Sequence, residues 1–146
     1  MTQSQKEPLL VLERVSHTFR TEVKSELQVL KNINVSIHSG EIIAFLGPSG
    51  CGKTTTLKIM SGLIAPTEGT VYTHGKPLKG INERIAMVFQ NFVLLPWYTV
   101  KQNVALGLHS PDLTRRQINN RVNEAIDLVG LGGFEEAYPR ELSGGM

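Results

Sequence analysis

Apolar residues along the chain follow two patterns that predict strands. Ile33, Val35 and Ile37 alternate with polar residues, as expected for a strand with one solvent-exposed face. Residues 41–46 (EIIAFL) are apolar after the first position, a pattern typical of a strand buried on both faces of a parallel sheet. The same reasoning predicts further strands at residues 9–15, 70–73 and 85–89, the last of them also buried.

Helical periodicity appears in three segments. Residues 54–63 fit a helix that ends before Ala65-Pro66, and a shorter helical pattern begins at Thr99. The clearest helix follows Thr114, which forms a capping box with Gln117. We expect this helix to use its apolar stripe for core packing, with Ile118, Val122, Ile126 and Val129 on one face and Arg115, Asn119, Asn120 and Glu124 on the other.

The composition is that of an ordinary globular domain and excludes several classes of protein. The 146 residues are 40% apolar and carry a formal charge of +2 without a basic block, which argues against nucleic acid as a partner. Cys51 is the only cysteine, so no disulfide forms within the chain and a reducing compartment is favoured. The longest apolar runs are far shorter than the roughly 20 residues that a membrane span needs. Residues 1–8 are expected to form a disordered lead-in.

The strongest motif lies between a predicted strand and a predicted helix. Residues 47–54 (GPSGCGKT) satisfy G-x-x-x-x-G-K-[ST], the P-loop pattern. Glycines let the backbone turn sharply, and successive N–H groups then form an anion nest at the start of the helix. We therefore expect a nucleoside-triphosphate site. The expected ATP-binding residues are Gly47, Pro48, Ser49, Gly50, Cys51, Gly52, Lys53, Thr54 and Thr55.

Three side chains of this motif have distinct expected roles. Lys53 places a full positive charge where it can reach the β and γ phosphates, and the Thr54 hydroxyl is the expected Mg²⁺ ligand. For Cys51, a small residue whose backbone faces phosphate is the favoured interpretation over a reactive thiol. ATP and Mg²⁺ are thus the expected cofactors.

Two further segments resemble the nucleotide-binding subunits of ABC transporters. Residues 142–146 (LSGGM) resemble the family's signature motif, and Val88-Phe89-Gln90 followed by LLPW at 94–97 resembles its Q-loop. Phe19, within VSHTF, stands where the family places the aromatic residue that stacks on adenine. With the P-loop, the resemblance covers nearly the whole chain from about residue 9.

The resemblance implies a fold and a domain organisation. The fold is expected to be α/β: a P-loop NTPase with a RecA-like ABC ATPase core, an antiparallel β subdomain and part of a helical subdomain, incomplete at the C-terminus. Residues 9–146 are expected to be the N-terminal portion of one such domain. Within it, residues 9–90 form the core with the P-loop, and residues 91–146 form the helical subdomain up to the signature.

The resemblance also implies roles for residues outside the P-loop. Gln90 is expected to position the attacking water and to ligate Mg²⁺ together with Thr54. Ser143, Gly144 and Gly145 are expected to contact the γ phosphate of ATP held by a second copy of the subunit, in a head-to-tail dimer.

Within the family, the chain is similar to the nitrate, sulfonate, taurine and bicarbonate importer ATPases. The similarity lies in LLPW, in Asn103-Val104 and in the FEEAYPRELSGGM run. It implies an ATPase that drives the uptake of such an anion, bound peripherally to the cytoplasmic face of a prokaryotic cell membrane. A transmembrane permease subunit is the expected direct partner, and a periplasmic or extracellular solute-binding protein an indirect one.

The chain departs from the family after the signature. Family members continue into an apolar strand ending in paired acidic residues and then a switch histidine, so the chain is expected to be truncated at Met146 and, alone, to be inactive in hydrolysis. The strand at 41–46 is then expected to be an exposed apolar edge that favours aggregation.

Two alternative functions are a non-hydrolysing nucleotide-binding remnant and another P-loop NTPase, either a kinase or a repair-type ABC ATPase. The Q-loop segment argues against a kinase. The lack of a coiled-coil insertion between Gln90 and Leu142 argues against the repair type.

Overall fold

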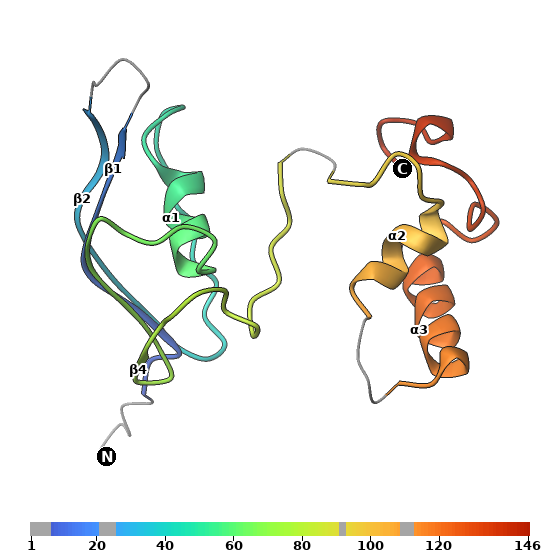
Figure 1. Ribbon diagram of the computed structural model, residues 1–146, viewed down its shortest axis with the longest axis horizontal. Helices are drawn as coiled ribbons and strands as arrows, with labels where there is room; N and C mark the ends of the chain where they lie inside the picture. The colour runs from blue at the N-terminus through green and yellow to red at the C-terminus, as the bar shows by residue number, and fades with distance from the viewer. Residues whose placement is uncertain (1–6, 21–25, 91–92, 109–112) are drawn as a thin grey trace. The chain divides into compact units, whose positions relative to one another are not determined.

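The computed structural model describes residues 7–20, 26–90, 93–108 and 113–146 (Figure 1). The chain divides into two compact units, Met1–Val88 and Phe89–Met146, and each is described by itself. Among the described helices, none has both the length and the apolar character that crossing a membrane requires.

The first unit is built on a four-stranded antiparallel sheet with strand order β2-β1-β3-β4. β1 (Leu10–Arg20) pairs with both β2 (Glu26–Ile37) and β3 (Glu68–Thr73), and the short β4 (Lys76–Pro77) pairs with β3. The strands expected at 33–37 and 70–73 thus lie within β2 and β3, and the one expected at 9–15 lies within β1 except for Leu9. The first strand continues beyond its expected end because β1 stays paired with β2 as far as Arg20.

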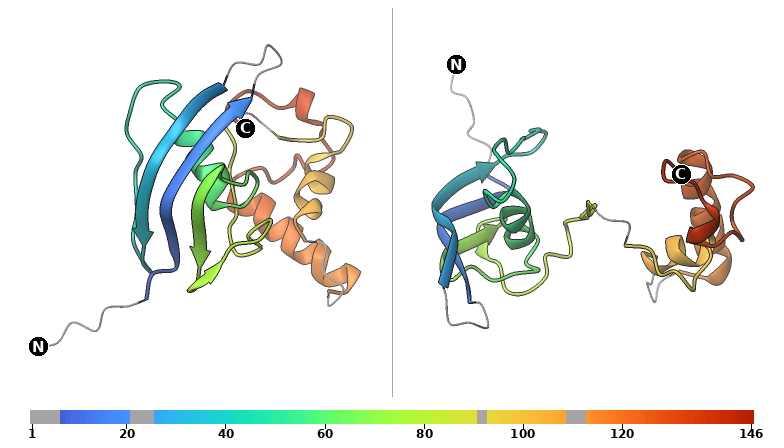
Figure 2. Two further views of the ribbon diagram at one scale, coloured as in Figure 1. Left: turned by 60° about the vertical axis from the view of Figure 1, so that its left-hand side comes forward. Right: turned by 90° about the horizontal axis from the view of Figure 1, so that it is seen from above.

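One helix, α1 (Lys53–Met60), lies against a face of this sheet (Figure 2). Ile59 and Met60 are the helix residues that join the apolar core. The helix ends earlier than its pattern predicts, because Gly62 adopts a left-handed φ of 75° immediately after the C-cap Ser61. From the sheet, the core takes Leu10, Leu12, Val15, Leu30 and Val71.

The expected parallel strands at 41–46 and 85–89 are not formed in this structure. Within the described residues neither segment pairs with a strand, and the Ile42 side chain is fully exposed. Leu46 and Val88 are 91% and 96% exposed. A continuously apolar strand is stable only with a neighbour on each side to satisfy its backbone groups. The prediction of buried strands is therefore wrong here, although the exposed apolar surface is as expected.

The second unit packs two helices that both begin with a capping box. The Thr114–Gln117 box predicted from the sequence starts α3 (Arg115–Leu128), and a Thr99–Gln102 box starts α2 (Val100–Leu106). The second box was not predicted, although its T-x-x-Q spacing is the same signal. A short 3-10 turn, η1 (Pro139–Glu141), follows.

The core of this unit confirms most of the predicted apolar stripe. Val122 and Ile126 are buried together with Val100, and Ile118 packs against them. Val129 was also assigned to the buried face and is instead 67% exposed. The reason is that α3 ends at Leu128, so Val129 is its C-cap and leaves the helical period.

Candidate nucleotide-binding site

The glycine-rich loop reaches α1 through backbone conformations that glycine favours. Gly50 and Gly52 have φ values of 82° and 95°, and Gly52 is the N-cap of α1. A Cβ atom on Gly52 would lie 2.6 Å from Leu30 Cδ2 and 2.9 Å from the Val29 carbonyl oxygen. Glycine is therefore required here both by conformation and by contact with β2, which fixes the end of the loop against the sheet.

The N-terminus of α1 is open toward the loop. No side chain caps it, and its first turn contains no acidic residue. The Thr56 N–H donates to the Gly52 carbonyl oxygen at 2.8 Å, and the buried Thr56 hydroxyl donates to the same oxygen at 3.0 Å. The N–H groups before Thr56 have no partner within the helix and carry the positive end of the helix dipole. This arrangement suits an anion.

Lys53 folds back over the loop. Its Nζ atom donates to the Gly47 and Pro48 carbonyl oxygens, each at 2.8 Å, and lies 3.7 Å from Cys51 Sγ. The loop thus holds an ammonium group among its own backbone atoms. Cys51 packs across the loop, because a Cβ on Gly47 would lie 2.7 Å from its sulfur. The charge of Lys53 adds to that of the helix N-terminus, which strengthens the attraction for phosphate.

Thr54 and Thr55 begin α1 beside the loop. Thr54 is exposed and Thr55 is half-buried. An exposed hydroxyl next to an anion site is available to a hard cation such as Mg²⁺, which takes oxygen ligands and also binds phosphate oxygens. The residues present therefore fit a magnesium–triphosphate complex.

The pairing register of β1 and β2 relates Phe19 to the strand position that the P-loop contacts. It pairs with Leu27 on β2, and the two side chains are 39% and 57% exposed. His17, two residues earlier on β1 and about 7 Å along the strand, pairs with Leu30, the residue that Gly52 contacts. The apolar surface of the Phe19–Leu27 pair is thus one strand repeat, two residues of β1, from the His17–Leu30 pair, where Gly52 contacts the sheet.

The remaining predicted site residues belong to the second unit. Gln90 is exposed. The signature residues Ser143, Gly144 and Gly145 are exposed too, in a turn closed by the Met146 N–H, which donates to the Ser143 carbonyl oxygen at 2.9 Å. The structure therefore brings together the P-loop residues and places Phe19 two residues along β1 from the partner of Leu30, whereas Gln90 and the signature lie in a separate unit.

Two residues that the sequence analysis gave no chemical role have well-defined surroundings. The Asn103 Oδ1 atom accepts a hydrogen bond from the Leu95 N–H at 2.8 Å, and its Nδ2 atom donates to the carbonyl oxygens of Leu95, Tyr98 and Thr99. It ties the LLPW segment to α2. His17 is buried beside Phe19, with ring centroids 4.6 Å apart. A histidine inside the VSHTF segment was the one available signal for it.

In the turn at residues 38–41, the carboxylate of Glu41 accepts a hydrogen bond from the backbone. The His38 N–H donates to Glu41 Oε2 at 2.7 Å, and His38 Nδ1 lies 3.3 Å from the same oxygen. The backbone hydrogen bond from His38 is the main reason that the pKa of Glu41 is below its ordinary value. This bond closes the turn at Ser39-Gly40, which leads into residues 41–46.

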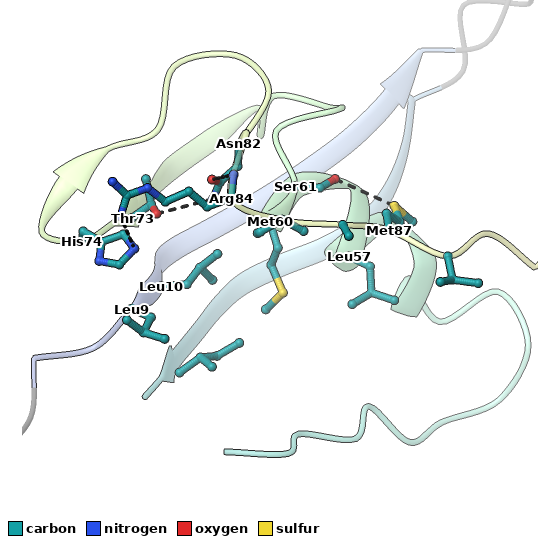
Figure 3. Close-up of a pocket in the computed structure, with 14 residues that line it drawn as sticks. Leu9, Leu10, Leu57, Met60, Ser61, Thr73, His74, Asn82, Arg84 and Met87 are labelled. Carbon is teal, nitrogen blue, oxygen red and sulfur yellow. Dashed lines mark hydrogen bonds between the residues drawn. The ribbon is translucent and has the colours of Figure 1, made fainter. Parts of the chain in front are cut away.

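A cavity of about 440 Å³ lies elsewhere in the first unit (Figure 3). Leu9, Leu10, Leu57 and Met60 contribute its apolar lining. At one end, Arg84 Nη1 lies 3.2 Å from His74 Nε2. No residue of the P-loop is among those that line it, so this cavity is distinct from the candidate phosphate site.

Comparison with known proteins agrees with this geometry. A family model described as "ABC transporter" matches residues 30–146. The nitrate import ATP-binding protein NrtD of Synechocystis sp. is 43% identical over 123 residues, 84% of this chain and 46% of its own length. The taurine import ATP-binding protein TauB of Ruegeria pomeroyi is 40% identical over 137 residues, 94% of this chain and 51% of its own.

Other solutes appear among the relatives. The spermidine/putrescine import ATP-binding protein PotA of Thermobifida fusca is 43% identical over 141 residues, 94% of this chain and 36% of its own. The chain spans about half the length of the nitrate and taurine relatives.

A solved structure extends the similarity to the fold. The dimeric ATP-binding cassette MJ0796, in a post-hydrolysis state bound to ADP and Pi, superimposes with a TM-score of 0.82 at 32% identity. The match covers 93% of this chain and 64% of that one. Together with the family match, this shows that the chain belongs to the ABC transporter family and has the α/β P-loop fold of its ATP-binding cassettes.

Proposed function

We propose that the chain binds Mg-ATP as the P-loop part of the ATP-binding subunit of an ABC importer. The observation that carries this proposal is the position of Lys53, whose ammonium group is held by two loop carbonyls at the uncapped N-terminus of α1. A triphosphate placed there meets a full charge, the helix dipole and the free amides of the first turn.

The loop residues divide the work of holding the nucleotide. Residues 47–55 bind the phosphates, with Lys53 directed to the β and γ groups and the Thr54 hydroxyl to Mg²⁺. The ion neutralises part of the phosphate charge when it is bound. Gly52 lets the end of the loop approach β2 closely, because any side chain at this position would meet Leu30 Cδ2 and the Val29 carbonyl oxygen.

Phe19 supplies the base platform in this proposal. Its side chain is partly exposed, and Leu27, which pairs with it on β2, is more exposed. A flat aromatic surface beside a phosphate site stacks on a purine without reading its edge, and such stacking contributes about 1–3 kcal/mol. The distance along β1 from Phe19 to the strand position facing the loop is one that a nucleoside triphosphate can span.

Hydrolysis and assembly are proposed from the second unit and from the relatives. Gln90 would orient water and Mg²⁺, and Ser143, Gly144 and Gly145 would complete the site of a second copy in a head-to-tail dimer. The MJ0796 cassette is described as dimeric, which supports this arrangement. Residues 1–8 act as a lead-in, residues 9–90 as the core and residues 91–146 as the helical subdomain.

The proposed biological setting draws on the named relatives. The nitrate and taurine importer proteins among them support a nitrate-, sulfonate- or taurine-type anion as the proposed solute, whereas the spermidine/putrescine importer protein names a different class of solute. The proposed partners are a transmembrane permease subunit and, through it, a solute-binding protein. The proposed location is the cytoplasmic face of the cell membrane.

The 146 residues by themselves are proposed to bind ATP and to turn it over at background rate. Lys53, Thr54 and the loop amides act on the bound substrate, and uniform binding does not raise the catalytic rate. A general base contributes about a hundredfold to ten-thousandfold. In the family this role falls to an acidic residue after the signature, and the family's switch histidine lies beyond it as well.

Equilibrium binding of Mg-ATP tests the proposal. Lys53→Ala removes a charge-assisted contact worth about 1.5–3 kcal/mol, so affinity is expected to fall about tenfold to a hundredfold. Lys58→Ala is the matched control, because Lys58 lies in the last turn of the same helix. Equal affinity in wild type and Lys53→Ala would refute the phosphate site. Phosphate release that depends on Lys53 would refute the background rate.

A further inference from the structure

His17 is a buried polar side chain for which the proposed function has no use. The residue is 7% exposed, and within the part of the chain that the structure describes neither ring nitrogen, Nδ1 or Nε2, has a hydrogen-bond partner. A neutral imidazole always carries one N–H donor and one acceptor nitrogen. A buried polar group without partners is rare in folded proteins and calls for an explanation.

The backbone of β1 directs this ring inward. The register between β1 and β2 shifts on both sides of His17, between Val15 and His17 and again between His17 and Thr18. As a result Val15, Ser16 and His17 are buried in succession, which a regular strand with alternating faces does not allow. Strand irregularities of this kind reorient single side chains, often beside functional sites.

The ring that His17 contacts is the proposed adenine platform. His17 and Phe19 have ring centroids 4.6 Å apart and ring planes at 82°, an edge-to-face contact. Such a contact is directional, because the positive edge of one ring meets the negative face of the other. With its nitrogens unpaired, the imidazole has this contact as its one oriented interaction among the described residues.

We propose that His17 is a positioning residue that fixes the Phe19 ring in the orientation that receives an adenine base. The inference rests on the proposed role of Phe19. Phe19 is 39% exposed while His17 is buried, so His17 supports the ring from the protein side and leaves surface free for the base. An aliphatic residue of similar size fills the space but has no ring with which to make this directional contact to Phe19.

Two substitutions separate the ring from the space it fills. His17→Leu removes the oriented contact and keeps apolar volume, whereas His17→Phe keeps an aromatic ring and removes both nitrogens. The probes are Mg-ATP and inorganic tripolyphosphate, which shares the phosphates and lacks the base. Phe19→Ala provides the reference for complete loss of the platform.

His17→Leu is expected to weaken Mg-ATP binding about threefold to tenfold, the range of one aromatic pair, and to leave tripolyphosphate binding unchanged. His17→Phe is expected to restore ATP affinity to within about twofold of wild type. In the Phe19→Ala background, His17→Leu is expected to cause no further loss.

Each other outcome overturns the inference in a recognisable way. If Phe19→Ala weakens ATP binding and His17→Leu does not, the platform stands and the positioning role fails. If His17→Leu weakens both probes equally, the residue maintains the fold and does not orient the ring. If Phe19→Ala leaves ATP affinity unchanged, the proposed adenine role fails, and the inference fails with it.

Discussion

Gly52 lies so close to Leu30 that a Cβ atom at this position would fall 2.6 Å from Leu30 Cδ2. Leu30 is 5% exposed and belongs to the core cluster under α1. The N-cap of the helix that carries Lys53 is thereby fitted to a core residue on β2, an edge strand of the sheet. The geometry of the proposed phosphate cradle consequently depends on the core of the β subdomain as well as on the loop sequence.

This contact predicts unequal effects of alanine at two glycines of the loop. Gly52→Ala combines a left-handed conformation with overlap, and we expect it to lower the free energy of unfolding by about 2–4 kcal/mol. Gly50→Ala is the matched control, because Gly50 has a φ of 82° and open space around it, and its expected cost is about 1–2 kcal/mol. Urea denaturation measures both. Equal losses would show that packing against Leu30 contributes nothing.

Asn103 predicts a test of the second unit. Asn103→Ala removes an amide whose oxygen accepts from the Leu95 N–H. The nitrogen of the same amide donates to the carbonyl oxygens of Leu95, Tyr98 and Thr99. The expected loss of stability is about 2–3 kcal/mol, since half-buried backbone groups are left unpaired. Hydrogen exchange at the Leu95 amide should accelerate selectively. Asn119→Ala, at an exposed position of α3, is the control and should change stability by less than about 0.5 kcal/mol. Unaltered protection at Leu95 would contradict the assigned role.

The hydrogen bond that Glu41 accepts predicts the direction in which its pKa is shifted. Its pKa is below the ordinary value for glutamate, mainly because the His38 backbone N–H binds the carboxylate. The stabilisation is therefore fully present above the ordinary pKa and disappears as the pH falls through the lowered one. NMR titration of the side-chain carboxyl measures this value directly. His38→Ala retains the backbone donor, so the pKa should stay lowered. A return to the ordinary value in that variant would assign the effect to the imidazole.

The sequence predicted elements whose signals are local. The Thr114–Gln117 box marks the start of α3 because a capping box needs only residues three positions apart. The P-loop pattern was equally local, and Gly52 and Lys53 adopt a geometry that fits it. By contrast, the apolar run at 41–46 indicates a strand that needs paired strands on both sides and apolar cover on both faces. The run itself does not provide those neighbouring strands.

Two of the features that were not predicted depend on contacts beyond the immediate sequence neighbourhood. Asn103 has its role because Leu95, eight residues away, turns back onto α2. The burial of His17 depends on register shifts between β1 and β2, which alternation alone does not reveal. Val129 was misplaced because the end of α3 lacks a strong stop signal before Gly130.

The exposed apolar residues before and after the P-loop helix predict self-association. Ile42 and Val88 are 100% and 96% exposed, and exposed apolar side chains favour association between molecules when they gather into a patch. Ile42→Lys and Val88→Lys should shift the protein toward monomer in sedimentation velocity experiments. Because neither side chain is packed, the free energy of unfolding should change by less than about 0.5 kcal/mol.

Gln28→Lys is the matched control for the added charge, since Gln28 is an exposed polar residue on β2. If apolar contact drives association, this variant should associate like wild type, because it removes no apolar surface. An equal shift toward monomer in all three variants would instead assign the effect to net charge, which suppresses association without regard to position. No shift in Ile42→Lys or Val88→Lys would place the associating surface elsewhere on the molecule.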